Sequence, residues 1–508
     1  MEQRRYGALA GLAAAAVALG VAELFAVLTG ARSAPLVAVG GVVVDTAPAP
    51  VKEFAVRVFY TYDKLALITG TAVGVAGFAA LVGILALRRS WYGLAGVALL
   101  GLAGAGAALT RHGASWTYAL PSVVGALAGA GVLLALRGLL SGEPQPSGEP
   151  QFLGEPRRRF LRLAGAALGV GLGAAAAGRW LSTRRDVSAA RAAVTLPAPA
   201  SSAPPLPAAA DRRLKELAPF VTDARDFYLI DTALTVPQID PAAWRLRIHG
   251  RVRRPLTLTY EQLLARPMIE RYITLACVSN EVGGSLIGNA RWLGVPVKDL
   301  LDEVGPLDGA DQVVSRSVDG FTAGTPTAVL SDGRDAMLAV GMNGEPLPVA
   351  HGFPVRMVVP GLYGYVSATK WLAELELASF RDFDAYWVRR GWARQAPVKT
   401  ESRIDTPRER ATVRRGRVIV AGVAWAQHRG VSRVEVRVDD GPWQAAALGA
   451  VPSVDTWRQW SWEWDAPAGT HRLWVRATDN GGQVQPEDEQ PPVPDGATGW
   501  HHVEVTVT

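Results

Sequence analysis

Long apolar runs dominate residues 1–181 of the chain. Four of them, near residues 6–30, 65–87, 91–110 and 120–139, each approach the roughly 20 residues that an α-helix needs to cross a bilayer. A fifth run follows the basic stretch EPRRRFLR. A shorter one between the first two, LVAVGGVVV, cannot span and predicts a re-entrant or interfacial piece. The pattern therefore predicts a transmembrane α-helical bundle of about five helices.

Basic residues at the ends of these runs indicate how the helices are oriented. Arginine pairs stand at 4–5 and 88–89, and three more arginines stand at 157–159. All three clusters lie on one side of the membrane if the N-terminus is cytoplasmic, as the positive-inside rule requires. The stretch RRRFL resembles a twin-arginine export signal and also fits the basic flank of a fifth span. Both interpretations place the rest of the chain outside the cytoplasm.

The membrane half offers little redox chemistry of its own. A haem b held in a helical bundle typically needs a pair of histidine ligands, and residues 1–181 contain only His112. Glu23 is the one carboxylate well inside a predicted span, as a functional group or as part of a helix contact. We expect this half to anchor the protein, or also to dock an electron-transfer partner.

Beyond the helices the pattern changes twice. Residues 182–211 hold the tract LPAPASSAPPLPAAA, which predicts an extended, poorly ordered linker. Over 212–403, strands such as WRLRIHG mix with short helices such as TYEQLLAR and VPVKDLLDEV without regular βαβ order, which indicates an α+β domain. Over 404–508, short alternating strands separated by turns, clearest in VSRVEVRVDDGPW, predict an immunoglobulin-like β-sandwich.

Composition then narrows the class of function. The net charge is +6, but the arginines form no basic stripe with interleaved aromatic residues, so no nucleic-acid binding is expected. With one cysteine in 508 residues, the chain cannot form an intrachain disulfide or a thiolate-rich zinc or iron–sulfur site.

The single thiol, Cys277, stands where the apolar strand YITLA runs into the polar, glycine-containing turn VSNEVGG. Such a loop lets the backbone approach a ligand closely. No histidine lies nearby in the sequence to act as a thiolate base, which argues against a cysteine-protease type of site. Two interpretations remain: a soft thiolate ligand for a redox-active metal, or a buried apolar cysteine.

The order of motifs over most of 220–508 resembles that of the sulfite oxidase family of molybdenum enzymes. It begins with FYLIDTALTVP and continues through LACVSNEVGG, ARWLGVPVKDLL and VDGFTAGTP to the long run MNGEPLPVAHGFPVRMVVPGLYGYVSATKWL. The resemblance implies a molybdopterin-binding oxidoreductase domain at 212–403 with Mo-molybdopterin as cofactor. It also implies that the sandwich at 404–508 is of the dimerisation type, and hence a homodimer.

The same resemblance implies the site residues, position by position. Cys277 would be the catalytic residue and the protein ligand to molybdenum, and His351 and Arg356 would contact the pterin and its phosphate. The other cofactor-binding residues that it implies are Phe227, Tyr228, Asp231, Asp319, Ala368, Thr369 and Lys370.

The expected substrate pocket departs from that of sulfite oxidases, which use arginines to bind a small dianion. Ile230 stands where the family has an arginine, Glu281 and Val282 where it has an arginine pair, and Trp392 where it has an active-site tyrosine. The departures predict fewer positive charges, one added carboxylate and more apolar surface. They favour a substrate other than sulfite, such as a sulfoxide, an N-oxide or another organic oxygen donor or acceptor.

We therefore expect a multi-pass cell-membrane protein whose extracytoplasmic molybdenum oxidoreductase region carries out oxygen-atom transfer on a small-molecule substrate. The chain has no Cys-x-x-Cys-His haem motif, so electrons would pass through a separate electron-transfer protein or a quinone-linked carrier. Two alternatives remain open. One is a catalytically silent module that uses the same fold to recognise a partner, and the other is a genuine sulfite oxidase with an altered pocket.

Overall fold

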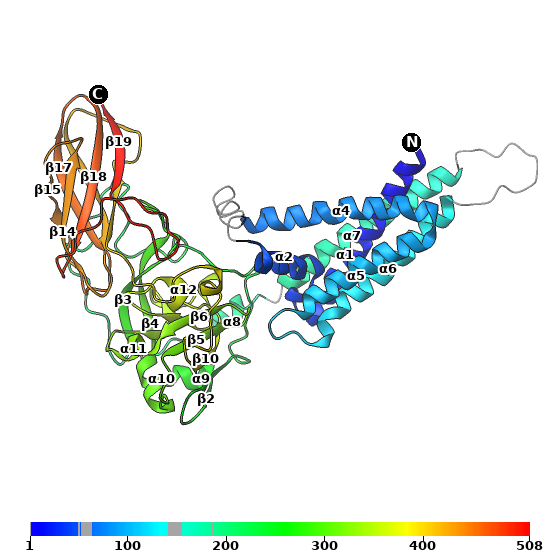
Figure 1. Cartoon of the computed structure of the whole chain (residues 1–508), viewed down its shortest axis with the longest axis horizontal. Helices are drawn as coiled ribbons and strands as arrows, with labels where there is room; N and C mark the ends of the chain where they lie inside the picture. Colours follow the sequence, from blue (N-terminus) through cyan, green and yellow to red (C-terminus); the bar gives the residue numbers. More distant parts are fainter. Residues whose placement is uncertain (1, 49–50, 52–62, 141–154, 184–185) are drawn as a thin grey trace, which may run out of the picture. The chain divides into compact units, whose positions relative to one another are not determined.

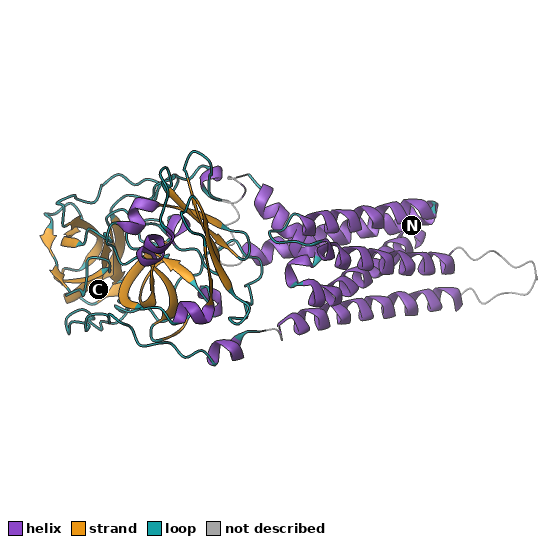
Figure 2. Cartoon of the chain, turned by 90° about the horizontal axis from the view of Figure 1, so that it is seen from below, coloured by secondary structure: helices purple, strands orange, loops and turns teal. Residues whose placement is uncertain are grey.

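A computed structural model describes residues 2–48, 51, 63–140, 155–183 and 186–508. The chain divides into two compact units. Unit 1 comprises Met1–Asp186 with Ala233–Val236, and unit 2 comprises Val187–Thr232 with Pro237–Thr508. Among the described residues, unit 1 is built of helices and the strands all belong to unit 2 (Figures 1 and 2).

The apolar runs of unit 1 form helices, as the sequence predicts. Within the described residues, five helices are long and apolar enough to cross a membrane. They are α1 (Glu2–Thr29), α4 (Asp63–Arg88), α5 (Ser90–Leu109), α6 (Leu120–Leu140, preceded by the 3-10 turn η3, Trp116–Ala119) and α7 (Glu155–Thr183). The short run between the first two spans follows η1 (Ala31–Ser33) and forms α2 (Pro35–Thr46), whose 12 residues are too few to span.

Small residues let the helices of unit 1 approach closely. α1 lies against α4, α6 and α7, and Gly11 on α1 meets the Ala79 carbonyl of α4 so closely that a Cβ would clash with it. Such close backbone contact is a common way for helices to associate in lipid, where hydrophobic burial between them is not available as a driving force. Glu23 of α1 has its electrostatic partner in Arg179 of α7, which places this carboxylate at a helix–helix contact.

The Pro/Ala-rich segment differs from the poorly ordered linker that the sequence predicts. After α8 (Ser188–Ala192), the Ala200 N–H donates a hydrogen bond of 2.8 Å to the Met268 carbonyl, and the Glu270 N–H donates one of 2.8 Å to Ser201. Ala210 is fully buried. Extended backbone keeps its donors and acceptors free, so it can pair beside a sheet edge, and this segment does so within unit 2.

The central region of unit 2 contains one antiparallel sheet and one mixed sheet with short helices, the α+β arrangement that the sequence predicts. One sheet has the order β3-β4-β7-β8 with β9 paired to β7, and the other has the order β2-β1-β10-β5-β6. The strands are β1 (Arg245–Gly250), β2 (Leu256–Thr259), β3 (Ile269–Ala276), β4 (Ile287–Pro296), β5 (Gln312–Ser317), β6 (Thr322–Pro326), β7 (Met337–Met342), β8 (Glu345–Pro346), β9 (Arg356–Val358) and β10 (Leu372–Ala378). The helical segments are α9 (Tyr260–Leu264), α10 (Val297–Val304), α11 (Thr327–Ser331), η4 (Val349–His351), α12 (Gly364–Ser367) and η5 (Val388–Arg390).

The amphipathic helix α10 shows how sequence pattern and core agree. It buries Val297, Leu300, Leu301 and Val304, a spacing that puts all four side chains on one face of an α-helix.

The C-terminal part of unit 2 is the predicted immunoglobulin-like sandwich. Its sheets have the orders β11-β13-β17-β16 and β12-β19-β18-β14-β15. The strands are β11 (Glu401–Thr406), β12 (Ala411–Val413), β13 (Gly416–Trp425), β14 (Val431–Val438), β15 (Gln444–Ala445), β16 (Ala447–Leu448), β17 (Arg458–Ala466), β18 (Gly469–Asp479) and β19 (His501–Val507). Val420 and Trp460 of one sheet share a core with Val434, Val475 and Val505 of the other. Inward positions alternate with outward ones, as a two-sheet sandwich requires.

Candidate active site

Cys277 directly follows β3 and lines a pocket of about 110 Å³ in unit 2. Its N–H donates a hydrogen bond of 2.9 Å to the Leu286 carbonyl, and its carbonyl accepts one of 3.1 Å from Asn280, so the loop closes on itself. Burial raises the pKa of the thiol, and hydrogen bonds with Ser279 act in the opposite direction. A buried thiol keeps its proton at neutral pH unless a cation replaces that proton, as happens when a metal binds.

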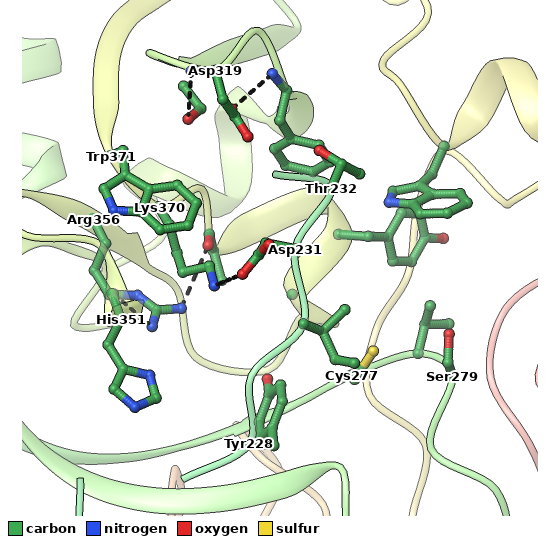
Figure 3. Close-up of a pocket in the computed structure, with 18 of the residues that line it drawn as sticks. Tyr228, Asp231, Thr232, Cys277, Ser279, Asp319, His351, Arg356, Lys370 and Trp371 are labelled. Atoms are coloured by element: carbon green, nitrogen blue, oxygen red, sulfur yellow. Dashed lines mark hydrogen bonds and ion pairs between the residues drawn. The ribbon is translucent and has the colours of Figure 1, made fainter. Parts of the chain in front are cut away.

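His351, Arg356 and Lys370 lie on the other side of the pocket from Cys277 (Figure 3). The Nε2 atom of His351 is 2.7 Å from the carbonyl oxygen of Ala224. Because a carbonyl only accepts, Nε2 carries the ring proton and Nδ1 keeps a free lone pair. Burial, helped by the charge of Arg356, lowers the pKa of His351 to about 4, so the ring is neutral near pH 7.

Arg356 is a buried cation, only 5% exposed. Its guanidinium donates to the backbone carbonyls of His351 (3.2 Å) and Ala368 (3.4 Å), while its Nε atom is buried with no hydrogen-bond partner among the residues that the structure describes. Burial lowers its pKa to about 10, which leaves the group charged at neutral pH. The ion pairs found among the described residues include none with Arg356. A buried guanidinium without a carboxylate is suited to an anionic ligand such as a phosphate.

Lys370 and Asp231 form an ion pair at the same side of the pocket. The Lys370 ammonium lies 2.6 Å from a carboxylate oxygen of Asp231 and donates a second hydrogen bond, of 3.1 Å, to the Ala350 carbonyl. The two side chains are 8% and 14% exposed. The sequence predicts both as cofactor-binding residues, and the structure shows that one offsets the charge of the other.

Most of the residues predicted for the site come together in this one pocket. Those that line it are Phe227, Tyr228, Asp231, Cys277, Asp319, His351, Arg356, Ala368 and Lys370. Thr369 does not line it: its hydroxyl is fully buried, 2.6 Å from that of Ser315. Asp319 accepts the Phe321 N–H at 3.1 Å within its own turn. The roles of these residues in binding and catalysis stay predictions.

The sequence predicts four pocket residues that differ from those of sulfite oxidases. Two of the four line the pocket, and two do not. Ile230 and Trp392 line it. The prediction of an added carboxylate there is wrong, because Glu281 is exposed and neither it nor Val282 is among the lining residues. The chain turns just after Asn280, where the Gly284 N–H donates to the Glu281 carbonyl at 2.8 Å. Sequence position beside a ligand residue therefore does not decide which way a loop side chain points.

Further pocket residues are aromatic, and the sequence reasoning did not single them out. Tyr365 and Trp387 both lie beside Trp392, with ring centroids 5.7 Å and 6.2 Å away, and Phe321 also lines the pocket. The Tyr365 hydroxyl donates a hydrogen bond of 2.7 Å to the Ala393 carbonyl. This bond fixes the position of the Tyr365 ring among the aromatic side chains that line the pocket. The segment FDAYWVRRGW is rich in aromatic residues, and this pattern could have predicted that Trp387 and Trp392 belong to one aromatic cluster.

Comparison with known proteins agrees with this geometry. The family model of the oxidoreductase molybdopterin binding domain matches residues 233–387, and the model of the bacterial Ig domain matches residues 401–475. Human mitochondrial sulfite oxidase is 32% identical over 329 residues, which are 54% of this chain and 60% of that protein. The uncharacterized oxidoreductase YuiH of Bacillus subtilis is 34% identical over 155 residues, or 30% of this chain and 74% of that protein.

The chain belongs to the sulfite oxidase family of molybdopterin oxidoreductases. It spans about 60% of the length of the human sulfite oxidase that it matches. The crystal structure of the sulfane dehydrogenase SoxCD from Paracoccus pantotrophus is similar at a TM-score of 0.47 and 26% identity, over 53% of this chain and 75% of that one.

As a sulfite oxidase family oxidoreductase, the protein has Mo-molybdopterin as its cofactor, and the pocket fits this group. Cys277 offers a soft thiolate, the ligand type that a redox-active metal prefers. On the other side, Arg356 is a buried cation whose Nε atom has no hydrogen-bond partner within the described part of the chain, and Lys370 adds an ammonium that is paired with Asp231. A group that coordinates a thiolate at one end and carries a phosphate at the other would satisfy both sides.

Proposed function

We propose that this oxidoreductase is anchored in the cell membrane by its five apolar helices, with unit 2 on the extracytoplasmic side. We propose further that it transfers an oxygen atom to or from an uncharged organic molecule, such as a sulfoxide or an N-oxide. One observation carries the choice of substrate: Ile230, Tyr365 and Trp392 make part of the pocket apolar and aromatic. A small dianion needs several cationic donors around it, and these residues supply none.

Some residues of the pocket would bind the cofactor, and others would shape the substrate site. When bound, Mo-molybdopterin supplies the two-electron oxygen-atom transfer. Cys277 would hold the metal, with Ser279 hydrogen-bonded to it. Arg356 would offset the charge of the phosphate, and the neutral His351 would offer Nδ1 to a donor of the pterin.

The partners of the enzyme follow from its composition. Residues 1–181 contain a single histidine, so electrons would pass to or from a separate electron-transfer protein or a quinone-linked carrier. The sandwich is the surface through which a homodimer would form. The alternative of a catalytically silent module is less well supported, because Cys277, His351 and Arg356 all line one pocket.

Metal analysis tests the cofactor assignment at Cys277. The full chain, made in a host that synthesises the molybdenum cofactor, should contain one molybdenum per chain. Cys277→Ser should lose the metal, while its thermal unfolding and its oligomeric state stay close to those of the wild type. Full molybdenum content in Cys277→Ser would refute the role of this thiol.

Substrate assays test the proposed reaction. The enzyme should reduce sulfoxides or N-oxides with an artificial electron donor, or oxidise the corresponding reduced compounds with an artificial acceptor. It should turn over sulfite poorly. Rapid turnover of sulfite, with no reaction of any neutral compound, would establish a genuine sulfite oxidase with an altered pocket instead.

A further inference from the structure

The helices of unit 1 line a second, partly open cavity of about 160 Å³. It lies between α1, α2, α4, α5 and α6 and is lined almost entirely by alanine, glycine, valine and leucine. An apolar protein cavity of about 150 Å³ is large enough to bind a benzene molecule. By size and lining, this cavity therefore suits one apolar six-membered ring.

Two hydroxyls line the cavity, and they differ in their hydrogen bonding. Thr71 donates to the Leu67 carbonyl at 2.8 Å, so its proton is already used. Ser122, in the first turn of α6, is 4% exposed, and its Oγ atom is buried with no hydrogen-bond partner among the described residues. A buried hydroxyl without a partner costs free energy, and an acceptor on a molecule bound in the cavity would remove that cost.

We propose that this cavity binds the ring of an isoprenoid quinone, with one ring carbonyl accepting a hydrogen bond from Ser122. A quinone combines a six-membered ring of the right size with carbonyl acceptors, and its isoprenoid tail dissolves in the lipid of the membrane. Oxygen-atom transfer exchanges two electrons, the number that separates a quinone from its quinol. The inference rests on the proposed membrane anchoring and not on the choice of substrate.

Binding of a short-tailed benzoquinone to the full chain in phosphatidylcholine nanodiscs tests this proposal. We expect saturable binding near one quinone per chain, above the partitioning into empty nanodiscs. Ser122→Ala should weaken binding about threefold to tenfold, the effect of one lost hydrogen bond. Ala126→Leu, which fills the cavity, should abolish it.

Two matched variants serve as controls. Ser115→Ala removes an exposed hydroxyl that is bonded to Thr117, and Ala128→Leu adds the same bulk to α6 outside the cavity lining; both should bind as the wild type does. If Ala126→Leu fails to fold, quinone binding by Ser122→Ala tests the proposal by itself. Binding no greater than to empty nanodiscs, or equal binding by Ser122→Ala and the wild type, would overturn the proposal. Because binding is measured without turnover, failure here leaves the proposed reaction untouched.

Discussion

The guanidinium of Arg403 donates a hydrogen bond of 2.7 Å to the carbonyl oxygen of Gly284. Arg403 belongs to β11 of the sandwich, and Gly284 belongs to the loop that begins at Cys277. The same guanidinium forms a 2.6 Å ion pair with Asp405, and the two side chains are only 12% and 7% exposed. His501 also packs directly on this loop, at Gly283. The sandwich therefore helps to hold the loop that carries the thiol.

Arg403→Ala should destabilise the protein and loosen the thiol loop. It leaves Asp405 buried without its cation, a change that costs about 3 kcal/mol of unfolding free energy. Molybdenum content should fall together with stability. Chemical unfolding and metal analysis of the full chain measure both quantities. Arg417→Ala on β13, whose ion pair with Glu463 is exposed, is the control and should change neither. An unchanged free energy of unfolding in Arg403→Ala would mean that the contacts of Arg403 with Asp405 and Gly284 do not stabilise the protein.

Glu401→Gln should stabilise the protein at alkaline pH. Glu401 is buried, one of its carboxylate oxygens has no partner among the described residues, and burial raises its pKa to about 8. Between pH 4.5 and 8 this carboxyl loses its proton in the unfolded chain but keeps it in the folded one. Stability therefore falls as pH rises through that range.

The Gln variant removes this loss and should be more stable than the wild type by on the order of 3 kcal/mol at pH 9, with no gain at pH 4. Unfolding curves across pH measure the difference. Glu409→Gln, at an exposed position, should show no such trend. An equal effect of Glu401→Gln at both pH values would mean that folding does not shift the pKa of this carboxyl.

Restoring positive charge to the pocket should restore use of an anion. Ile230→Arg places a guanidinium where the pocket is apolar, and a hydrogen bond to a charged group contributes enough to raise kcat/KM for sulfite about tenfold or more. The matched control is Leu229→Arg, since Leu229 is 50% exposed and does not line the pocket. Sulfite oxidation at low ionic strength is the assay. An equal gain in both variants would assign the effect to general surface charge.

Lys370→Met should weaken retention of the cofactor. The substitution removes an ammonium from the pocket and leaves Asp231, 14% exposed, without its cation. We expect about a tenfold to hundredfold weaker retention, as for a lost charge-assisted hydrogen bond. Fluorescence of the oxidised pterin released from purified protein measures the content. Lys298→Met on α10 removes an exposed lysine and should retain the cofactor. Wild-type content in Lys370→Met would show that the ion pair serves folding alone.

Much of the fold of this protein could be predicted from its sequence, because the patterns that predict its helices and strands are local. Apolar runs of membrane-spanning length, period-two alternation in the sandwich and the helical spacing of α10 each depend on neighbouring residues only. The motif order around Cys277, His351 and Arg356 likewise led to the family. The sequence by itself thus determined the helices, the class of each domain and the cofactor.

Tertiary structure decided what depends on direction and on distant partners. Whether Glu281 points into the pocket or out of it is set by the turn after Asn280, and the charge of Lys370 is offset by Asp231, 139 positions earlier in the chain. The hydrogen bond from Arg403 to the thiol loop arises only when separate elements pack together, and so does the burial of the Ser122 hydroxyl without a partner among the described residues. Hydrogen bonds and ion pairs act over a few ångströms in space, whatever the separation along the chain, and no local pattern records them.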